Sequence, residues 1–338
     1  MKTLDIELWG GQIRGEAPNH GTRVAKVSVP RAIALRDRFV HGYARFAPTC
    51  RAVDEPGVAL IAIDEDSGAP AGVACLRARP DRHVAAIVGR HDRCDLYLAS
   101  NDRLALRQLA VIVSPVEDWR AGSADVSYRI IDLRTHDGMI DEESRPLRGL
   151  RSEGPAIVRC GGHVIFALPL GDPTDWPESA EDAWSYLPER IYFDELVHPP
   201  DGSIVRPPLD RHITVVTRTG GPRHTGMKLV SKADLAGRLD LVGPAIAGTL
   251  DIGHAALRDG VLLGRYDRCN GAPILADHSL SRVHALLVHV DDRLLLIDTA
   301  STNGTRRVGG DDARLIELVA DTDLELGDDT RARWTWVS

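Results

Sequence analysis

Short apolar runs, each closed off by polar and turn-forming residues, recur along most of the chain. Two of the clearest are Leu109–Val113 and Ala285–Val290, and short runs bounded by turn residues predict β-strands. The segment His212–Thr217 is β-branched and alternating, which predicts one more strand ahead of the C-terminal part. Val, Leu, Ile and Thr are abundant, while 31 glycines and 20 prolines supply turns. The pattern therefore predicts an all-β protein.

The chain also contains an internal repeat. The heptapeptide Gly89–Asp95 reappears as Gly264–Asn270, 264 − 89 = 175 residues later, with five of seven positions identical. In the same register, Arg107 and Arg282 each follow 18 residues after the leading glycine, and each precedes one of the apolar runs. Two further strand-like segments match in the same order, 128–133 and 294–299. Such self-similarity predicts a duplicated β domain.

A length of 338 residues leaves room for two domains and connecting segments. We expect an extension without an assigned role at 1–55, in which residues 30–50 could form a short helix, and a first β-sandwich at 56–171. A second sandwich is expected at 226–338. The intervening 172–225 begins with many prolines and acids and is predicted to be an acidic, Pro-rich linker. Its aromatic residues leave open that the segment packs onto a domain.

Composition narrows the function classes. The formal net charge of −8 disfavours nonspecific attraction to nucleic acid, because neutralising phosphates takes clustered Lys and Arg. No stretch approaches the run of about 20 apolar residues that a spanning helix needs. The first ten residues lack the apolar core of a secretory signal, so we expect a cytoplasmic protein. Five scattered cysteines without a Cys-x-x-Cys pair indicate buried thiols rather than a disulfide framework or a zinc site.

Four short motifs follow one another in the C-terminal part. They are Gly264-Arg265, Ser281-Arg282-Val283-His284, Ser301-Thr302-Asn303-Gly304-Thr305, and the segment Leu324–Gly327 ahead of a final strand. This ordered series resembles the Gly-Arg, Ser-Arg-x-His and Ser-Thr-Asn-Gly-Thr signatures of the forkhead-associated (FHA) family. The resemblance covers roughly residues 226–338. It implies a β-sandwich whose loops at one end hold phosphothreonine.

The residue types suit that task. Arg265 offers a planar fork of donors that matches phosphate oxygens, and it is expected to be the principal phosphate contact. Ser281 supplies a short hydroxyl donor, and Arg282 beside it adds charge or contacts peptide carbonyls. The resemblance places Thr302 at the pocket rim. Asn303 has an amide that both donates and accepts hydrogen bonds, which suits clamping an extended peptide next to the phosphothreonine.

Three further residues are expected to support the binding loops without touching the ligand. The resemblance makes His284 a brace that holds the loops by side-chain hydrogen bonds, and Gly304 a turn residue with a special backbone conformation. Gly264 of the Gly-Arg motif belongs with them. We expect no metal and no cofactor, since His278, His284 and His289 lie six and five residues apart rather than four apart on a helix.

In the first copy, the ungapped register puts Arg90 in the place of Arg265 and Arg107 in that of Arg282, and beyond a loop that is nine residues longer in the first copy Gly138 takes the place of Gly304. The other pocket positions change, with Leu106 for Ser281, Leu109 for His284, His136 for Thr302 and Asp137 for Asn303. Leu106 removes a phosphate donor, and Asp137 brings a carboxylate close to the phosphate position, where like charges repel. We therefore expect 56–171 to form an FHA-like sandwich that does not bind phosphothreonine and serves protein contact or support.

These observations favour a non-enzymatic adaptor in Ser/Thr kinase signalling, whose C-terminal FHA domain docks on a phosphothreonine-containing protein. A structural or assembly subunit of a larger complex, such as a secretion apparatus, with phosphopeptide contact as a regulatory input, stays open. Ser281 or Ser301 with His284 and Asp298 has the composition of a hydrolase triad, but no Gly-x-Ser-x-Gly turn accompanies them. An enzyme within 1–55 or 172–225 has no sequence feature in its favour.

Overall fold

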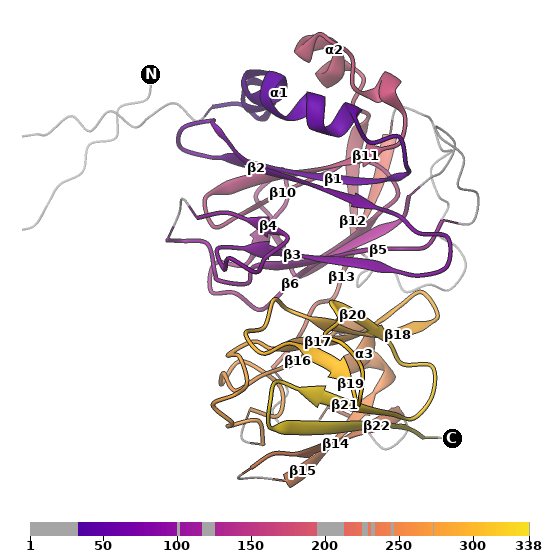
Figure 1. Ribbon diagram of the computed structural model, residues 1–338. Helices are drawn as coiled ribbons and strands as arrows, with labels where there is room; N and C mark the ends of the chain where they lie inside the picture. The colour runs from indigo at the N-terminus through magenta and orange to yellow at the C-terminus, as the bar shows by residue number, and fades with distance from the viewer. Residues whose placement is uncertain are drawn as a thin grey trace, which may run out of the picture.

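The computed structural model describes residues 33–99, 102–116, 126–194, 213–224, 229–230, 234–244, 247–272 and 274–337. These residues form two β-sandwiches stacked one on the other, with two helices on the outer side of the first (Figure 1). The all-β class predicted from the sequence is confirmed. The stacking matters for function, because it brings loops of the first sandwich against loops of the second.

The first sandwich consists of two sheets. One has the order β2-β1-β11-β10-β7-β8 and contains β1 (Gly57–Asp64), β2 (Pro70–Arg77), β7 (Met139–Ile140), β8 (Pro146–Leu147), β10 (Ala156–Cys160) and β11 (His163–Leu170). The other has the order β12-β13-β9-β6-β5-β3-β4 and contains β3 (Val84–Gly89), β4 (Leu96–Tyr97), β5 (Leu109–Val113), β6 (Tyr128–Asp132), β9 (Gly149–Ser152), β12 (Glu189–Asp194) and β13 (Ile213–Thr219).

Helices cover the outer face of the sheet that contains β1. Helix α1 (Leu35–Arg51) packs Phe39 and Phe46 against that face, so the short helix expected near 30–50 is present and belongs to the first domain. Alternate residues of β1 contribute to two cores, one between the sheets and one beneath the helix. Because β1 is buried on both faces, apolar residues are favoured at every position, which explains its nearly continuous apolar sequence.

The prediction that 172–225 is a linker is wrong for the residues of this segment that the structure describes. The 3₁₀ helix η1 (Pro173–Asp175) and helix α2 (Ala180–Ser185) pack beside α1, while β12 and β13 extend a sheet of the first sandwich. The acids that suggested a linker include Asp172, whose carboxylate accepts a hydrogen bond from Thr174 N–H at the start of η1. Acidic and proline residues start helices as readily as they solvate a linker, so composition alone misassigned the segment.

The second sandwich is smaller. One sheet has the order β15-β14-β22-β21-β19 and contains β14 (Leu235–Val242), β15 (Ala247–Gly253), β19 (Thr305–Arg307), β21 (Thr322–Leu326) and β22 (Thr330–Trp336). The other has the order β16-β17-β18-β20 and contains β16 (Val261–Leu263), β17 (Ala285–Val290), β18 (Arg293–Asp298) and β20 (Leu315–Glu317). The short helix α3 (His254–Asp259) leads into β16, and Trp334 is fully buried between the sheets.

The two sandwiches meet sheet against sheet. In β5, Leu109, Val111 and Val113 face their own core, while Ala110 and Ile112 pack against the second domain. Strands β17 and β18 divide their residues in the same way between their own core and the interface. The apolar runs in both copies are therefore uninterrupted because each strand is buried on two faces, one of them by the neighbouring domain.

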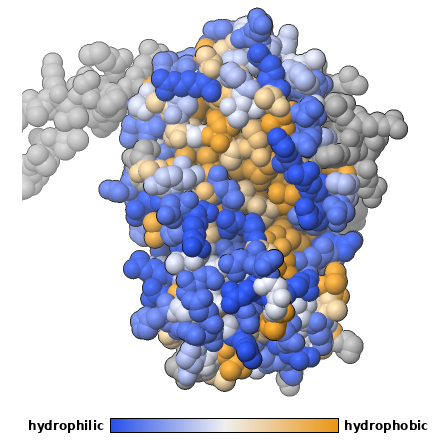
Figure 2. Space-filling model, viewed as in Figure 1, coloured by the Kyte–Doolittle hydropathy of each residue, from blue (hydrophilic) through white to orange (hydrophobic). Residues whose placement is uncertain are grey.

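A groove of about 640 Å³ opens at the edge of the first sandwich, between β2 and β3. In the view of Figure 2, apolar surface gathers over the first sandwich while the second is largely polar. Cys75 lines this groove and is half-buried, whereas the other four cysteines are buried, and all five are free thiols. Within the part of the chain that is described, no helix is long and apolar enough to cross a membrane.

Candidate functional site

The residues singled out in the C-terminal motifs converge on two loops at one end of the second sandwich. Arg265 follows β16, Ser281 and Arg282 precede β17, and Thr302 and Asn303 lie between β18 and β19. The backbone N–H of Thr302 donates to Ser281 Oγ at 3.0 Å, which joins the two loops directly. Arg265, Arg282 and Thr302 are exposed, so the structure presents them to solvent around the Ser281 hydroxyl.

The guanidinium of Arg265 is held at its base and open at its tip. Its Nε donates to the carbonyl of Leu280 at 2.9 Å, which fixes the direction of the side chain. Among the described residues, no carboxylate lies within 4 Å of the guanidinium of Arg265 or Arg282. Two cations without a neighbouring anion make this end of the domain suited to a dianionic ligand.

Asn303 is half-buried and has one end of its amide engaged. Its Nδ2 donates to the carbonyl of Ser279 at 3.0 Å, which orients the side chain. The amide oxygen has no partner among the described residues and can accept a hydrogen bond from a peptide N–H.

His284 bridges the two loops from below. It is fully buried, the N–H of Ser281 donates to its Nδ1 at 3.1 Å, and its Nε2 donates to the carbonyl of Gly304 at 2.9 Å. An acceptor Nδ1 together with a donor Nε2 requires the neutral Nε2-protonated ring. Burial lowers the pKa of His284, which keeps that neutral form. The geometry is that expected of a brace.

Both glycines expected to support the loops occupy positions where a side chain does not fit. Gly304 has φ +75°, and a Cβ there would lie 2.4 Å from the carboxylate of Asp312. A Cβ on Gly264 would lie 2.4 Å from the carbonyl oxygen of Arg282. Glycine at these positions lets Gly304 lie against Asp312 and lets Gly264 lie against the backbone of Arg282.

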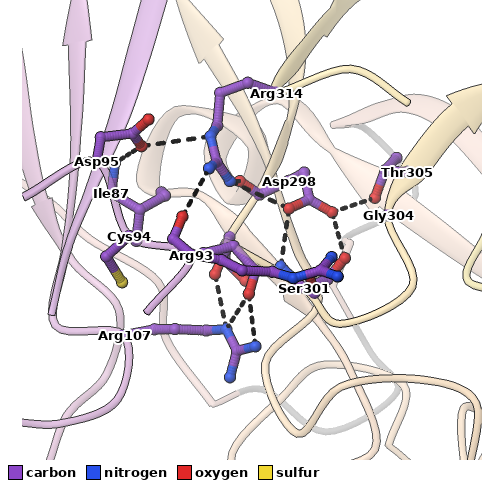
Figure 3. A network of polar contacts seen from close by, with 12 residues as sticks. Ile87, Arg93, Cys94, Asp95, Arg107, Asp298, Ser301, Gly304, Thr305 and Arg314 are labelled. Carbon is purple, nitrogen blue, oxygen red and sulfur yellow. Dashed lines mark hydrogen bonds and ion pairs between the residues drawn. The ribbon is translucent and has the colours of Figure 1, made fainter. Parts of the chain in front are cut away.

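Asp298 at the end of β18 organises the loop that carries Thr302 and Asn303 (Figure 3). Its carboxylate accepts hydrogen bonds from Ser301 N–H at 2.8 Å, Ser301 Oγ at 2.5 Å and Thr305 Oγ1 at 2.8 Å. Sequence reasoning missed this role, although Asp298 is the last residue of an apolar strand and stands three residues before Ser301. His284 forms no hydrolase triad with these residues, because backbone groups of Ser281 and Gly304 engage both of its ring nitrogens.

Backbone pairing corrects the register between the two copies. Arg265 N–H donates to Ser281 O and Tyr266 N–H to Arg282 O, while Arg90 N–H donates to Ala105 O and His91 N–H to Leu106 O. Ala105 therefore takes the place of Ser281, and Leu106 that of Arg282, at an offset of 281 − 105 = 176. The expected equivalences of Leu106 with Ser281, Arg107 with Arg282 and Leu109 with His284 are each wrong by one residue.

The change of offset from 175 to 176 arises in one loop. Asp95 and Asn270 are equivalent, since their side chains accept from Ile87 N–H and Leu262 N–H respectively, at the original offset of 270 − 95 = 175. Beyond them the second copy has one more residue before its serine. An ungapped match hides this insertion because it pairs Arg107 with Arg282, and because the apolar run Leu109–Val113 overlaps Ala285–Val290 in either register.

In the corrected register, Gln108 replaces His284 and keeps its function as a brace. Its Oε1 accepts from Ala105 N–H at 3.1 Å and its Nε2 donates to the carbonyl of Gly138 at 3.2 Å, the contacts that His284 makes with Ser281 and Gly304. An amide suits this exchange because it carries an acceptor and a donor, as a neutral imidazole does.

Comparisons with known proteins concern the C-terminal sandwich. Residues 261–329 match the model of the family described as FHA domain, so the C-terminal sandwich contains an FHA domain. Similar solved structures include the FHA-1 domain of Mycobacterium tuberculosis Rv1747, at 20% identity, covering 30% of this chain and 99% of that one, with a TM-score of 0.24. The FHA domain of Chlamydia trachomatis CT664 shows 22% identity over 30% of this chain and 99% of that one, with a TM-score of 0.26.

A third similar structure is the FHA domain of yeast Dun1, solved with a doubly phosphorylated peptide derived from Rad53. It has 22% identity, covers 32% of this chain and 79% of that one, and has a TM-score of 0.25. No curated protein matches the chain. Among the described residues, no group of three or more His, Cys, Asp and Glu side chains is placed to hold a metal ion.

Proposed function

We propose that this chain is a phosphothreonine-dependent protein-binding adaptor in Ser/Thr kinase signalling, acting in the cytoplasm, and that it docks through its C-terminal FHA domain. The observation that carries the proposal is the pocket itself, in which Arg265, Arg282 and Thr302 stand exposed around the Ser281 hydroxyl without a carboxylate to neutralise them. The FHA family match over 261–329 supports the same assignment.

Each pocket residue has a distinct task in this proposal. The fork of Arg265 binds phosphate oxygens with charge-assisted hydrogen bonds, and Ser281 donates its hydroxyl proton to another oxygen. Arg282 adds charge or contacts peptide carbonyls, and Thr302 lines the rim. Asn303 uses its unoccupied amide oxygen to accept from the peptide backbone beside the phosphothreonine. His284, Gly264 and Gly304 hold the loops.

An oriented peptide library tests the proposal. The full chain is titrated with labelled peptides carrying phosphothreonine, phosphoserine or threonine at one fixed position, and binding is followed by fluorescence anisotropy. We expect saturable binding of phosphothreonine peptides and none of the threonine peptides. Equal binding of phosphorylated and unphosphorylated peptides, or no binding of either, would falsify the proposal.

We also propose that the first sandwich is a degenerate copy that does not recognise phosphothreonine. Arg90 survives there and donates to the carbonyl of Leu104 at 2.7 Å, as Arg265 does to Leu280. Around it, however, Ala105 and Leu106 offer no side-chain donor, and Asp137 brings a carboxylate to the position of Asn303. A phosphate there would meet one cation and one anion.

Replacing Arg90 by Ala checks this point. We expect phosphopeptide affinity of the Arg90→Ala chain to stay within about twofold of wild type, because the phosphate binds at the other domain. Isothermal titration calorimetry on the full chain also gives the stoichiometry, which we expect to be one peptide per chain. A second site, or its loss in Arg90→Ala, would show that the first domain binds after all.

A further inference from the structure

In the corrected register, Arg107 is equivalent to Val283 and not to the pocket residue Arg282. Its side chain crosses to the second domain. There its Nε donates to the carbonyls of Thr299 at 2.7 Å and Ala300 at 3.1 Å (Figure 3). Its Nη2 donates to Ala300 at 2.6 Å and lies 3.4 Å from Ser281 Oγ. Only 8% of this arginine is exposed.

These contacts involve both loops of the phosphothreonine pocket. Thr299 and Ala300 begin the segment that carries Thr302 and Asn303, and Ala300 has φ +61°, an unfavourable conformation for a residue with a side chain. The fork of Arg107 ties the carbonyls of this turn to one another and to the Ser281 loop. A single side chain from the first domain thereby spans the base of the pocket in the second.

The contact with Arg107 affects the direction in which the Ser281 hydroxyl donates its proton. A hydroxyl has one proton to donate and two lone pairs that accept. Thr302 N–H points at one lone pair from 3.0 Å, and Arg107 Nη2 points at the oxygen from 3.4 Å. With its acceptor side engaged, the oxygen directs its proton away from the protein interior. The contact with Thr302 Oγ1, at 3.4 Å, is long for O–H···O and is readily exchanged for a phosphate oxygen.

Arg107 also brings charge to the pocket. Its guanidinium lies within 4 Å of no described carboxylate, and the nearby Asp298 is engaged by Ser301, Thr305 and Arg314. In a buried position this charge is weakly screened by water and salt. Its Nη2 lies 3.4 Å from the hydroxyl that is expected to bind phosphate.

We propose that the phosphothreonine site is composite, with Arg107 of the first domain as a positioning residue that orients the Ser281 hydroxyl and the Thr302 loop of the second. This inference rests on the proposed function and extends it, because it gives the first sandwich a part in recognition without a ligand of its own. High-affinity docking then requires both domains in one chain.

The test is a double-mutant cycle in the full chain, with Arg107→Met, Ser281→Ala and the pair, using the phosphothreonine peptide selected from the oriented library. We expect Arg107→Met to weaken binding about tenfold, because the Thr299 and Ala300 carbonyls lose the guanidinium that holds the Thr302 loop. In the Ser281→Ala background the same change should cost clearly less than tenfold, because one of the two groups through which Arg107 acts is gone.

Arg129→Met is the matched control. Arg129 is likewise 8% exposed and lies in the same interface, where it donates to the carbonyls of Arg258 and His289 in the second domain and to that of Gly220 after β13, far from the pocket loops. It should leave affinity within about twofold. Arg107→Lys, which keeps the charge but not the fork, should lose nearly as much as Arg107→Met, and thermal unfolding verifies that each variant is folded.

The outcomes separate the two ideas. If wild type ignores the phosphothreonine peptide, the proposed function fails and this inference fails with it. If wild type binds and Arg107→Met binds equally well, the composite site alone is refuted. It is also refuted if the effects of Arg107→Met and Ser281→Ala multiply independently, or if Arg129→Met matches Arg107→Met, since Arg107 would then act only by holding the domains together.

Discussion

Replacing Arg265 by Ala is expected to weaken phosphothreonine peptide binding by roughly 100-fold, or about 3 kcal/mol, without unfolding the protein. The fork of Arg265 is the principal phosphate contact in the proposed site, and the hydrogen bond from its Nε to the carbonyl of Leu280 fixes its direction. Because the side chain is exposed, its loss creates no cavity. Titration of the full chain by fluorescence anisotropy measures the change.

Arg90→Ala serves as the control for this experiment, because Arg90 makes the same backbone contact in the first domain. The melting temperatures of both variants should match wild type. Retained affinity in Arg265→Ala would place the phosphate elsewhere on the molecule.

Replacing His284 by Leu is expected to destabilise the protein by about 2–5 kcal/mol, because it leaves the buried N–H of Ser281 and the buried carbonyl of Gly304 without their partner. The two pocket loops then lose their brace, so phosphopeptide binding should fall as well. Chemical denaturation and peptide titration on the same sample give the two quantities.

Gln108→Leu is the matched control for His284→Leu. It removes the equivalent brace from the first domain, so it should lower stability while leaving peptide affinity close to wild type. Full phosphopeptide affinity in a folded His284→Leu chain would contradict the role of His284.

We expect the stability of the protein to depend on pH through His284. Burial lowers the pKa of His284 in the folded protein below the value of about 6.5 that it has in the unfolded chain. As the pH falls through 6.5, the unfolded chain takes up a proton that the folded one refuses, so stability decreases toward acid. Thermal unfolding between pH 7.5 and about 5 should show this decrease in wild type, and a smaller one in His284→Leu.

That Arg265, Ser281, Thr302 and Asn303 lie close together was predictable from sequence, because they sit at fixed places in contiguous motifs. Their part in binding stays a prediction. Fixed spacing within a loop survives because each loop closes on itself through local hydrogen bonds, such as those from Ser301 to Asp298. Asp298 itself could have been inferred as the organiser of that loop.

The contacts between domains were harder to infer. The interface follows from side chains of β5, β17 and β18 that alternate between two cores, and an uninterrupted apolar run predicts burial on both faces without naming what covers either face. An ungapped alignment pairs Arg107 with the pocket residue Arg282, one position away from its true equivalent Val283. Its role appears only when backbone pairing fixes the register.

The sheet-against-sheet contact has a consequence for how such a chain evolves. Loop positions of the first domain that do not contact the second domain are free to take other residues. The outer face of β3, β5 and β6 has no such freedom, because Ile87, Ala110 and Ile112 shield Leu286 and Val288 of the partner domain from water. We therefore expect the interface positions of the first domain to stay apolar, and tolerated substitutions to fall at loop positions outside the interface.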